Sequence, residues 1–227
     1  MRVKSTIFLI ALVFALFIMA AIDRDSGRDQ KELFSFSEQD ALDKWKEKIF
    51  KGKVDYTIDI KDSEGFVHGI SQQAASGYYY RLRYNPREKP WISWKWKVIK
   101  FPDKKRTDIK DPDLDDYGAR VYVVFPSGSF LNSKCIEYVW DEFAEEETVE
   151  SSPYSKNLKI YVVRSGRDEM GQWVYEERNL VDDYKKAFGY NLKLNVGAVA
   201  FMTDADSVKD TSEAFFDEIR IGYKKEK

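Results

Sequence analysis

The sequence contains one cysteine, Cys135, and one histidine, His68, among its 227 residues. A single cysteine excludes an intrachain disulfide and any metal cluster built from cysteine ligands. A single histidine excludes a histidine-rich metal site, and any Ser-His-Asp triad would depend on His68 alone. The fold must therefore be stabilised by its hydrophobic core, and an aromatic content of 15% suits that role.

Both of these residues lie in strand-like runs. Cys135 belongs to "SKCIEYVW" and is predicted to be a buried, apolar side chain. His68 belongs to "EGFVHGISQ", where it shares the parity of Phe66 and opposes Val67. We therefore expect His68 on the surface of a strand.

An excess of basic residues is also missing. Lysine and arginine total 37, aspartate and glutamate total 39, and the formal net charge is −2. Nucleic-acid binding depends on a cationic excess, so this balance argues against a nucleic acid as partner. Neither a glycine-rich phosphate loop nor a βαβ alternation is present, which argues against nucleotide binding.

The one long apolar run lies at the start of the chain. It extends from Ile7 to Ile22 and follows Arg2 and Lys4. A basic start before such a run is typical of a secretory signal, and the run is short for a membrane span of about 20 residues. The "MAA" that precedes Ile22 matches the A-x-A cleavage pattern poorly, so a retained anchor is the alternative.

This pattern predicts three parts: a signal peptide or N-terminal anchor over 1–22, a flexible linker over 23–32, and a single β-sandwich domain over 33–227. We expect an exported protein that is periplasmic, secreted or anchored with its domain outside the cytoplasm. Contact with a membrane is expected only through an uncleaved N-terminal segment.

Alternating, aromatic-rich segments separated by turn residues dominate the rest of the chain. Expected strands are Leu33–Phe36, Val54–Ile60, Phe66–Gln72, Gly77–Tyr84, Trp91–Val98, Ala119–Phe125, Cys135–Trp140, Leu158–Val163, Trp173–Asn179, Val196–Thr203 and Ala214–Tyr223. Many short strands with few helices indicate an all-β, mainly antiparallel sandwich or barrel.

Two segments have helical spacing. "SEQDALDKWKEKIF", residues 37–50, places Leu42, Trp45 and Ile49 on one face after a serine cap. "NLVDDYKKAFG" repeats an apolar residue every four positions and closes on Gly189, a suitable C-cap. Both are predicted to be short helices.

The stretch "WISWKWKV" is the clearest strand. Trp94, Trp96 and Val98 share one parity and lysines occupy the other, which predicts an apolar inner face and a polar outer face. Trp91 has the outer parity and follows a proline, so we expect it to be the most exposed of the three tryptophans and a candidate for ligand binding.

The densest acidic segment is "DIKDPDLDDYGAR". Asp115 and Asp116 precede Tyr117 and Arg120 at the start of a strand, where a polar group could orient a ligand. The segment lacks the spacing of an EF-hand, and a solvated loop is the alternative interpretation.

Polar residues also follow two other apolar strands. Arg164 ends one of them, and Asp204 and Asp206 end another in "MTDADS". Strand ends are where sandwiches carry ligand loops, although aspartates also cap turns. Together with Asp115, Asp116 and Trp91, these residues are the predicted ligand-binding set.

Carboxylate pairs for glycoside hydrolysis were considered as well. Retaining enzymes hold two carboxyls about 5 Å apart and inverting enzymes about 6.5–9.5 Å apart. Glu137 and Asp141 would lie about 14 Å apart along a strand, which is too far. The enzyme alternative, a glycan hydrolase or lyase, would use Asp115, Asp116, Glu137 or Glu177.

A resemblance is carried by stretches between about residue 90 and residue 222: "PWISWKWKV", "DDYGARVYVVF", "IEYVW", "VRSG", "GQWVYEERNLVDDYKKAFG", "VGAVAFMTDAD" and "FFDEIRI". In this order they resemble an exported bacterial family, domain of unknown function 3047. The resemblance implies a fold and a compartment and assigns no catalytic residues.

A looser similarity connects the opening "FSFSEQD" and the closing "FDEIRI" with galactose-binding-type jelly rolls, the fold of many carbohydrate-binding modules. That similarity implies a structural calcium beside the last strand, with Asp217 and Glu38, or Asp40, as ligands. We therefore predict an exported jelly-roll sandwich that is non-catalytic and binds carbohydrate or an envelope glycan. The alternatives are the enzyme above and a structural envelope protein that binds another protein.

Overall fold

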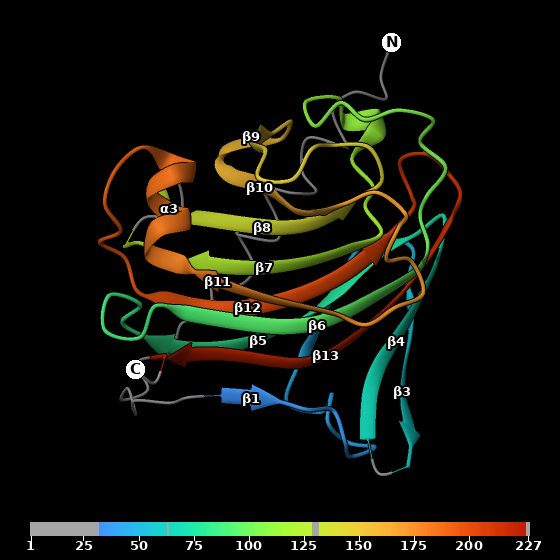
Figure 1. The fold of residues 1–227 in the computed structure, drawn as a ribbon, viewed down its shortest axis with the longest axis horizontal. Helices are drawn as coiled ribbons and strands as arrows, with labels where there is room; N and C mark the ends of the chain where they lie inside the picture. Colours follow the sequence, from blue (N-terminus) through green and yellow to red (C-terminus); the bar gives the residue numbers. More distant parts are fainter. Residues whose placement is uncertain (1–31, 63, 129–131, 226–227) are drawn as a thin grey trace.

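The computed structural model describes residues 32–62, 64–128 and 132–225. The chain is a jelly-roll β-sandwich of two mainly antiparallel sheets packed face to face (Figure 1). The predicted export segment, residues 1–22, and residues 23–31 of the predicted linker lie outside the described residues. Within those described ranges, the helices are too short or too polar to cross a bilayer.

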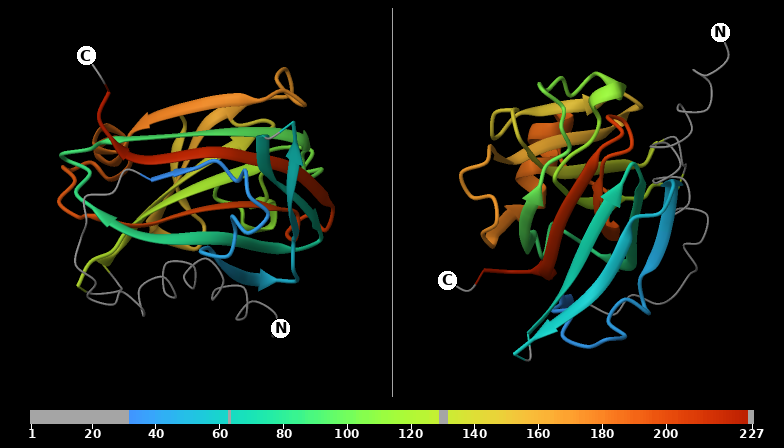
Figure 2. Two further views of the ribbon diagram at one scale, coloured as in Figure 1. Left: turned by 90° about the horizontal axis from the view of Figure 1, so that it is seen from below. Right: turned by 90° about the vertical axis from the view of Figure 1, so that its right-hand side faces the viewer.

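The first sheet has six strands, in the order β11, β6, β13, β4, β3, with β1 paired to β13 beside this path. Its described pairings are antiparallel. The strands are β1 (Glu32–Phe34), β3 (Asp55–Lys61), β4 (Glu64–Gln72), β6 (Trp91–Lys100), β11 (Val174–Asn179) and β13 (Thr211–Tyr223). The β3–β4 hairpin, drawn in cyan, lies at one corner of the sandwich (Figure 2).

The second sheet has seven strands, in the order β2, β5, β12, β7, β8, β10, β9. Its β8 and β10 run parallel, whereas its other described pairs are antiparallel. The strands are β2 (Lys46–Lys51), β5 (Ala75–Tyr84), β7 (Ala119–Phe125), β8 (Lys134–Asp141), β9 (Val149–Ser152), β10 (Ser155–Ser165) and β12 (Val196–Asp204).

Aromatic side chains fill the space between the sheets. Trp94 and Trp96 on β6 are fully buried. The Trp94 ring lies 5.2 Å from Tyr138 and the Trp96 ring 6.0 Å from Trp140, both on β8 of the opposite sheet. Trp91 is only partly buried. The predicted alternation along this strand is therefore confirmed, and its indoles are mostly core.

Each predicted strand overlaps an observed one, and the second predicted helix is also present. α3 (Leu180–Phe188) is capped by Asn179, whose side-chain oxygen accepts the backbone N–H of Val181 at 3.0 Å. Gly189 ends the helix with a φ of 79°, the left-handed conformation that glycine adopts without strain.

The predicted helix over residues 37–50 is wrong. The chain forms turns up to Lys44 and then β2, which pairs with β5 at the edge of the seven-stranded sheet. Trp45 packs on Phe34 and Phe201, with ring centroids 4.9 and 5.1 Å away, whereas Ile49 is 50% exposed. The apolar residues of this segment have helical spacing by coincidence. The segment is rich in lysine, and such a composition also suits an exposed edge strand. The four-residue edge strand β9 is likewise not among the predicted strands.

The single cysteine and histidine lie where their strands predict. Cys135 is buried on β8, and burial raises the pKa of its thiol well above the ordinary value. His68 lies on β4 on the outer surface of the six-stranded sheet, with its side chain partly exposed. Both predictions are confirmed.

Candidate functional site

Four of the predicted ligand residues meet at one end of the seven-stranded sheet. The short 3₁₀ helix η1 (Pro112–Leu114) leads into Asp115 and Asp116, and β12 ends at Asp204 with Asp206 in the following turn. β7 lies between β12 and β8 and adds Arg120, while β8 adds Glu137. We call this set the ionic cluster: Asp115, Asp116, Arg120, Glu137, Asp204 and Asp206.

Arg120 is the centre of the ionic cluster and is only 3% exposed. Its Nε donates to Asp204 Oδ1 at 2.8 Å, its Nη1 donates to Glu137 Oε1 at 2.5 Å, and its Nη2 donates to Asp204 and to the backbone carbonyl of Asp115. A buried guanidinium requires such partners, because an unpaired buried charge costs several kcal/mol. The cluster therefore ties β7, β8, β12 and the loop before β7 together.

The aspartates also hold loop backbone in place. The Asp116 carboxylate accepts the N–H of Ser207 at 3.2 Å and that of Val208 at 2.7 Å. Asp204 accepts the N–H of Tyr117 at 3.2 Å. These bonds join the loop before β7 to the turn after β12, which is turn chemistry rather than ligand binding.

The ionic cluster carries more carboxylates than cations. Burial raises the pKa of Asp115 to about 7, even though Arg120 opposes the shift. Burial likewise raises the pKa of Asp204 well above its ordinary value, and it raises that of Asp206, which pairs with Lys51 at 3.2 Å. The surplus of negative charge is thus accommodated partly by protonation.

Asp116, Asp204 and Asp206 each place one carboxylate oxygen within 4.8 Å of the others. Oxygen ligands in this arrangement are of the kind that calcium binds. However, both oxygens of Asp116 and of Asp204 already accept hydrogen bonds from the protein. The donor groups of the chain itself satisfy these carboxylates, so the arrangement is explained as a structural one.

The carboxylates considered for glycoside hydrolysis are paired with cations. Glu137 accepts from Arg120, and Asp141 forms an ion pair with buried Lys104. Glu177, on β11 of the other sheet, accepts from the Tyr223 hydroxyl at 2.8 Å and pairs with Lys225. These contacts hold the three carboxylates in place. Asp115, the other carboxylate near Glu137, shares the Arg120 guanidinium with it.

The other two predicted ligand residues lie elsewhere. Arg164, on β10, pairs with Glu169 at 2.8 Å and Glu176 at 3.0 Å. Trp91 begins β6 on the other sheet, and Lys225 Nζ lies 3.8 Å from the centroid of its ring. The predicted ligand set therefore divides into three separate places.

The residues predicted for calcium are Asp217 and Glu38. Asp217 lies at a bulge in β13; its Oδ1 is buried and has no hydrogen-bond partner within the described ranges. Burial raises the pKa of Asp217 to about 7. An orphaned, buried carboxylate oxygen fits a cation ligand chemically. Glu38 is exposed in the turns that follow β1, and calcium at these residues stays a prediction.

The outer face of the six-stranded sheet carries an aromatic surface that the sequence pattern does not predict. Phe66 on β4, Phe215 on β13 and Trp173 just before β11 lie with ring centroids 5.3–6.2 Å apart. The ammonium of Lys97, on β6, lies 4.2 Å from the Phe215 centroid and 5.0 Å from that of Trp173. We call these four residues the aromatic platform. Trp173 is 39% exposed, so the platform faces solvent.

Hydrogen-bonding groups border the aromatic platform. The His68 ring stacks on Phe215 at 4.2 Å. Its Nε2 lies 2.9 Å from Glu213 and its Nδ1 3.4 Å from Asp59. Burial lowers the pKa of Lys97, the cation above the rings. Exposed rings beside a cation and carboxylates can stack on the apolar side of a small molecule and bond to its polar groups.

The aromatic platform could have been found only through strand pairing. Phe215 is opposite Lys97 on one side and opposite His68 on the other, so outer-face positions of three strands become neighbours. The sequence shows the parity of Phe66 and His68 but not which strands lie beside them. That pairing is a property of the fold.

The chain is similar in fold to several solved structures. One is the family 11 carbohydrate-binding module of the cellulase Lic26A-Cel5E of Clostridium thermocellum, at 11% identity and a TM-score of 0.45, covering 89% of this chain and 99% of that one. Another is the CBM22-1 xylan-binding domain of Paenibacillus barcinonensis Xyn10C, at 11% identity and a TM-score of 0.43, covering 88% and 100%.

A third is the K1 cleaved adhesin domain of Lys-gingipain from Porphyromonas gingivalis W83, at 11% identity and a TM-score of 0.40, covering 86% of this chain and 99% of that one. The chain matches none of the curated proteins. Its residues 43–220 match the family model described as "Protein of unknown function (DUF3047)". Since that match spans most of the chain, the protein belongs to the DUF3047 family.

Proposed function

We propose that this protein is an exported, non-catalytic β-sandwich that binds carbohydrate, and that the aromatic platform is where the sugar stacks. The observation that carries the proposal is the gathering of Phe66, Phe215 and Trp173 around the Lys97 ammonium on a solvent-facing side of the sheet. Contiguous apolar surface of this kind can mark a binding site; Trp173 is exposed, and Phe66 and Phe215 are partly exposed beside it.

The chemistry of the aromatic platform suits a sugar. A pyranose ring has an apolar side of C–H groups and a rim of hydroxyls. The rings supply a stacking surface, and the Lys97 ammonium and the Glu213 carboxylate supply a donor and an acceptor beside it. Strands carry Phe66, Lys97 and Phe215, and Trp173 directly precedes β11, so little backbone ordering is needed on binding.

The first test is a glycan array probed with the full-length protein, followed by calorimetric titration of the best neutral glycan. Trp173→Ala should lower the affinity about tenfold, which corresponds to about 1.4 kcal/mol. Phe143→Ala is the matched control, because Phe143 is also an exposed aromatic residue, 43% exposed, and lies outside the platform. If wild type and Trp173→Ala bind the glycan with equal affinity, the aromatic platform is not part of the binding site.

The same array separates the alternatives. Cleavage of a bound glycan by the wild type would indicate a hydrolase or lyase instead. If the folded protein binds no glycan on the array, the third alternative, a structural envelope protein that binds another protein, is favoured.

Export belongs to the proposal and has its own test. The basic start and the apolar run between Ile7 and Ile22 support it. Fractionation of cells that make the full-length chain should place it outside the cytoplasm. Replacement of three leucine or isoleucine residues in the run by aspartate should retain the protein in the cytoplasm, and full-length wild-type protein in the cytosol would contradict export.

A further inference from the structure

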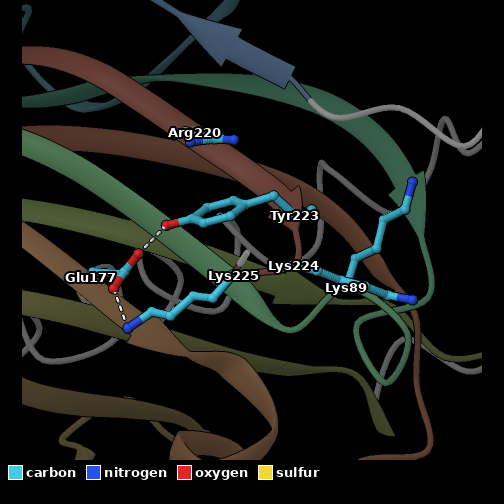
Figure 3. Close-up of a pocket in the computed structure, with 7 residues that line it drawn as sticks. Lys89, Glu177, Arg220, Tyr223, Lys224 and Lys225 are labelled. Atoms are coloured by element: carbon cyan, nitrogen blue, oxygen red, sulfur yellow. Dashed lines mark hydrogen bonds and ion pairs between the residues drawn. The ribbon is translucent and has the colours of Figure 1, made fainter. Parts of the chain in front are cut away.

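A pocket lies near the end of β13, and Figure 3 shows the residues that line it. Its volume is about 670 Å³. Four cationic residues line it, Lys89, Arg220, Lys224 and Lys225, whereas Glu177 is its single carboxylate among the lining residues. We call it the cationic pocket.

Bulges in β13 bring two of the lining residues to one side of the sheet. Arg220 and Tyr223 are three positions apart, so a regular strand would point them to opposite faces. The register shifts between Ile221 and Tyr223, and Gly222 between them has a φ of 78°. The Arg220 guanidinium consequently lies over the Tyr223 ring, 4.2 Å from its centroid. A bulge of this kind redirects side chains, and here it places an arginine on an aromatic floor.

One donor of the Arg220 guanidinium is unsatisfied within the described part of the chain. Its Nε is buried and has no hydrogen-bond partner among the residues that the structure describes. Stacking on Tyr223 fixes the guanidinium plane without using its N–H donors. A planar fork of donors held in this way is suited to the two oxygens of a carboxylate or phosphate.

The single carboxylate in the cationic pocket is already engaged. Glu177 accepts from the Tyr223 hydroxyl at 2.8 Å and pairs with Lys225, as Figure 3 shows. Lys225 in turn covers the Trp91 ring, with its Nζ 3.8 Å from the centroid. In Figure 3 the Lys89 and Lys224 side chains extend on the side away from Glu177. The pocket therefore has a surplus of positive charge around Arg220.

The cationic pocket and the aromatic platform share a face. Trp91, Lys95 and Lys97 have the same parity on β6, and β11 carries Glu177 with the outer parity beside them. Trp91 borders the pocket through Lys225, and Lys97 belongs to the platform. Lys97 is six positions after Trp91, which corresponds to about 20 Å at about 3.3 Å per residue. One extended ligand can reach both.

We infer that the cationic pocket binds a carboxylate or phosphate group carried on a sugar, so that the ligand of this protein is an acidic glycan. This inference rests on the proposed carbohydrate binding and adds the class of sugar. Arg220 holds the oxyanion, Lys224 adds positive charge, and Glu177 competes with the ligand for Lys225.

The test titrates the full-length protein at low salt with glucuronate, glucose 6-phosphate, inorganic phosphate and glucose. The side-chain Nε–H resonance of Arg220 is followed by NMR and assigned by its loss in Arg220→Gln. The two acidic sugars should shift this resonance and bind at least tenfold more tightly than glucose. Their binding should weaken as salt rises, because a charged group is being recognised. Inorganic phosphate binding as tightly as the acidic sugars would overturn the assignment to a sugar.

Two variants are expected to change the affinity for glucuronate in opposite directions, so a loss of binding caused by misfolding can be recognised. Arg220→Gln should lower the affinity for glucuronate about tenfold or more. Glu177→Gln should raise it several-fold, since it removes the competing charge and keeps an oxygen for the Tyr223 hydroxyl. General damage to the pocket would weaken binding in both variants, and such a result would overturn the inference. If Arg220→Gln does not fold, Lys224→Gln at an exposed position replaces it and should weaken binding severalfold.

Failure of this inference can be distinguished from failure of the proposed function. If a neutral glycan binds and depends on Trp173 while Arg220→Gln leaves acidic sugars unaffected, only the inference is wrong. If no sugar of either kind binds the folded protein, the proposed function is wrong as well.

Discussion

Two charged regions of this molecule differ in how their charges are used. In the ionic cluster, Arg120 is buried and each of its partners comes from the chain itself. In the cationic pocket, Arg220 borders open space and its Nε has no partner among the described residues. Charges that pair with one another inside the protein stabilise the fold. A surplus of charge of one sign beside a cavity can instead interact with a ligand of the opposite charge. The difference supports our proposal that the ligand binds on the six-stranded sheet.

The largest expected effect is on the free energy of unfolding, and it is measured by breaking a buried ion pair and, for comparison, an exposed one. Arg120→Met should lower the free energy of unfolding by about 3–5 kcal/mol, because Asp204 and Glu137 would remain buried without their cation. Lys95→Met, which breaks the half-exposed pair with Glu218 at 2.7 Å, should cost at most about 1 kcal/mol. Urea unfolding of the two variants measures both. Similar costs would show that the ionic cluster is not the structural element described.

The second prediction concerns pH. Burial raises the pKa of Asp115 to about 7, above an unfolded value of about 3.9. Between these values the folded protein binds more protons than the unfolded chain, so Asp115 makes the protein less stable as pH rises from about 4 to about 7. The loss should be on the order of 2–4 kcal/mol. Asp115→Asn should flatten this part of the stability curve, and Asp113→Asn, at an exposed position of η1, should not.

The third prediction asks whether a cation binds at β13. If calcium binds through Asp217, a concentration of about 100 times its dissociation constant should stabilise the fold by about 2.7 kcal/mol and raise the melting temperature by about 5–10 °C. Asp217→Asn should abolish that rise, whereas Asp59→Asn should preserve it. A melting curve that does not change in millimolar calcium would exclude a stabilising site there.

The smallest expected effect is on glycan affinity. Its size distinguishes ligand binding at the ionic cluster from ligand binding on the six-stranded sheet. Asp115→Asn combined with Asp116→Asn removes two carboxylates of the ionic cluster and leaves the aromatic platform untouched. We expect glycan affinity to change less than twofold in this variant, once circular dichroism has shown it to be folded. A larger loss would move the ligand to the seven-stranded sheet, where Asp115 and Asp116 were first predicted to bind it.

Much of the fold could be predicted from periodicity. The alternation around Trp94 and Trp96 identifies the core face of β6, and the Asn179 and Gly189 caps identify α3. The helix predicted over residues 37–50 is wrong. A single sequence does not distinguish helical spacing from a turn that is followed by a lysine-rich edge strand. Edge strands have little apolar pattern to detect.

The candidate site could be predicted only in part. Asp115, Asp116, Asp204 and Asp206 come together because strand ends share an edge of a sheet, which the sequence indicates. The aromatic platform depends on which strands are neighbours, and the cationic pocket depends on a bulge at Gly222. A net charge of −2 for the whole chain conceals the local positive surplus at Arg220.

The buried thiol of Cys135 makes the opening of the seven-stranded sheet measurable over time. Cys135 is the sole cysteine of the chain, lies on β8 and is buried with an elevated pKa. A thiol reagent can reach it only when the side chains that pack over it, such as Tyr79, Tyr122 and Met202, move aside, so the labelling rate in native buffer reports how often this part of the sheet opens. The protein thus carries an internal probe of its rare open states, and no residue has to be introduced to follow them.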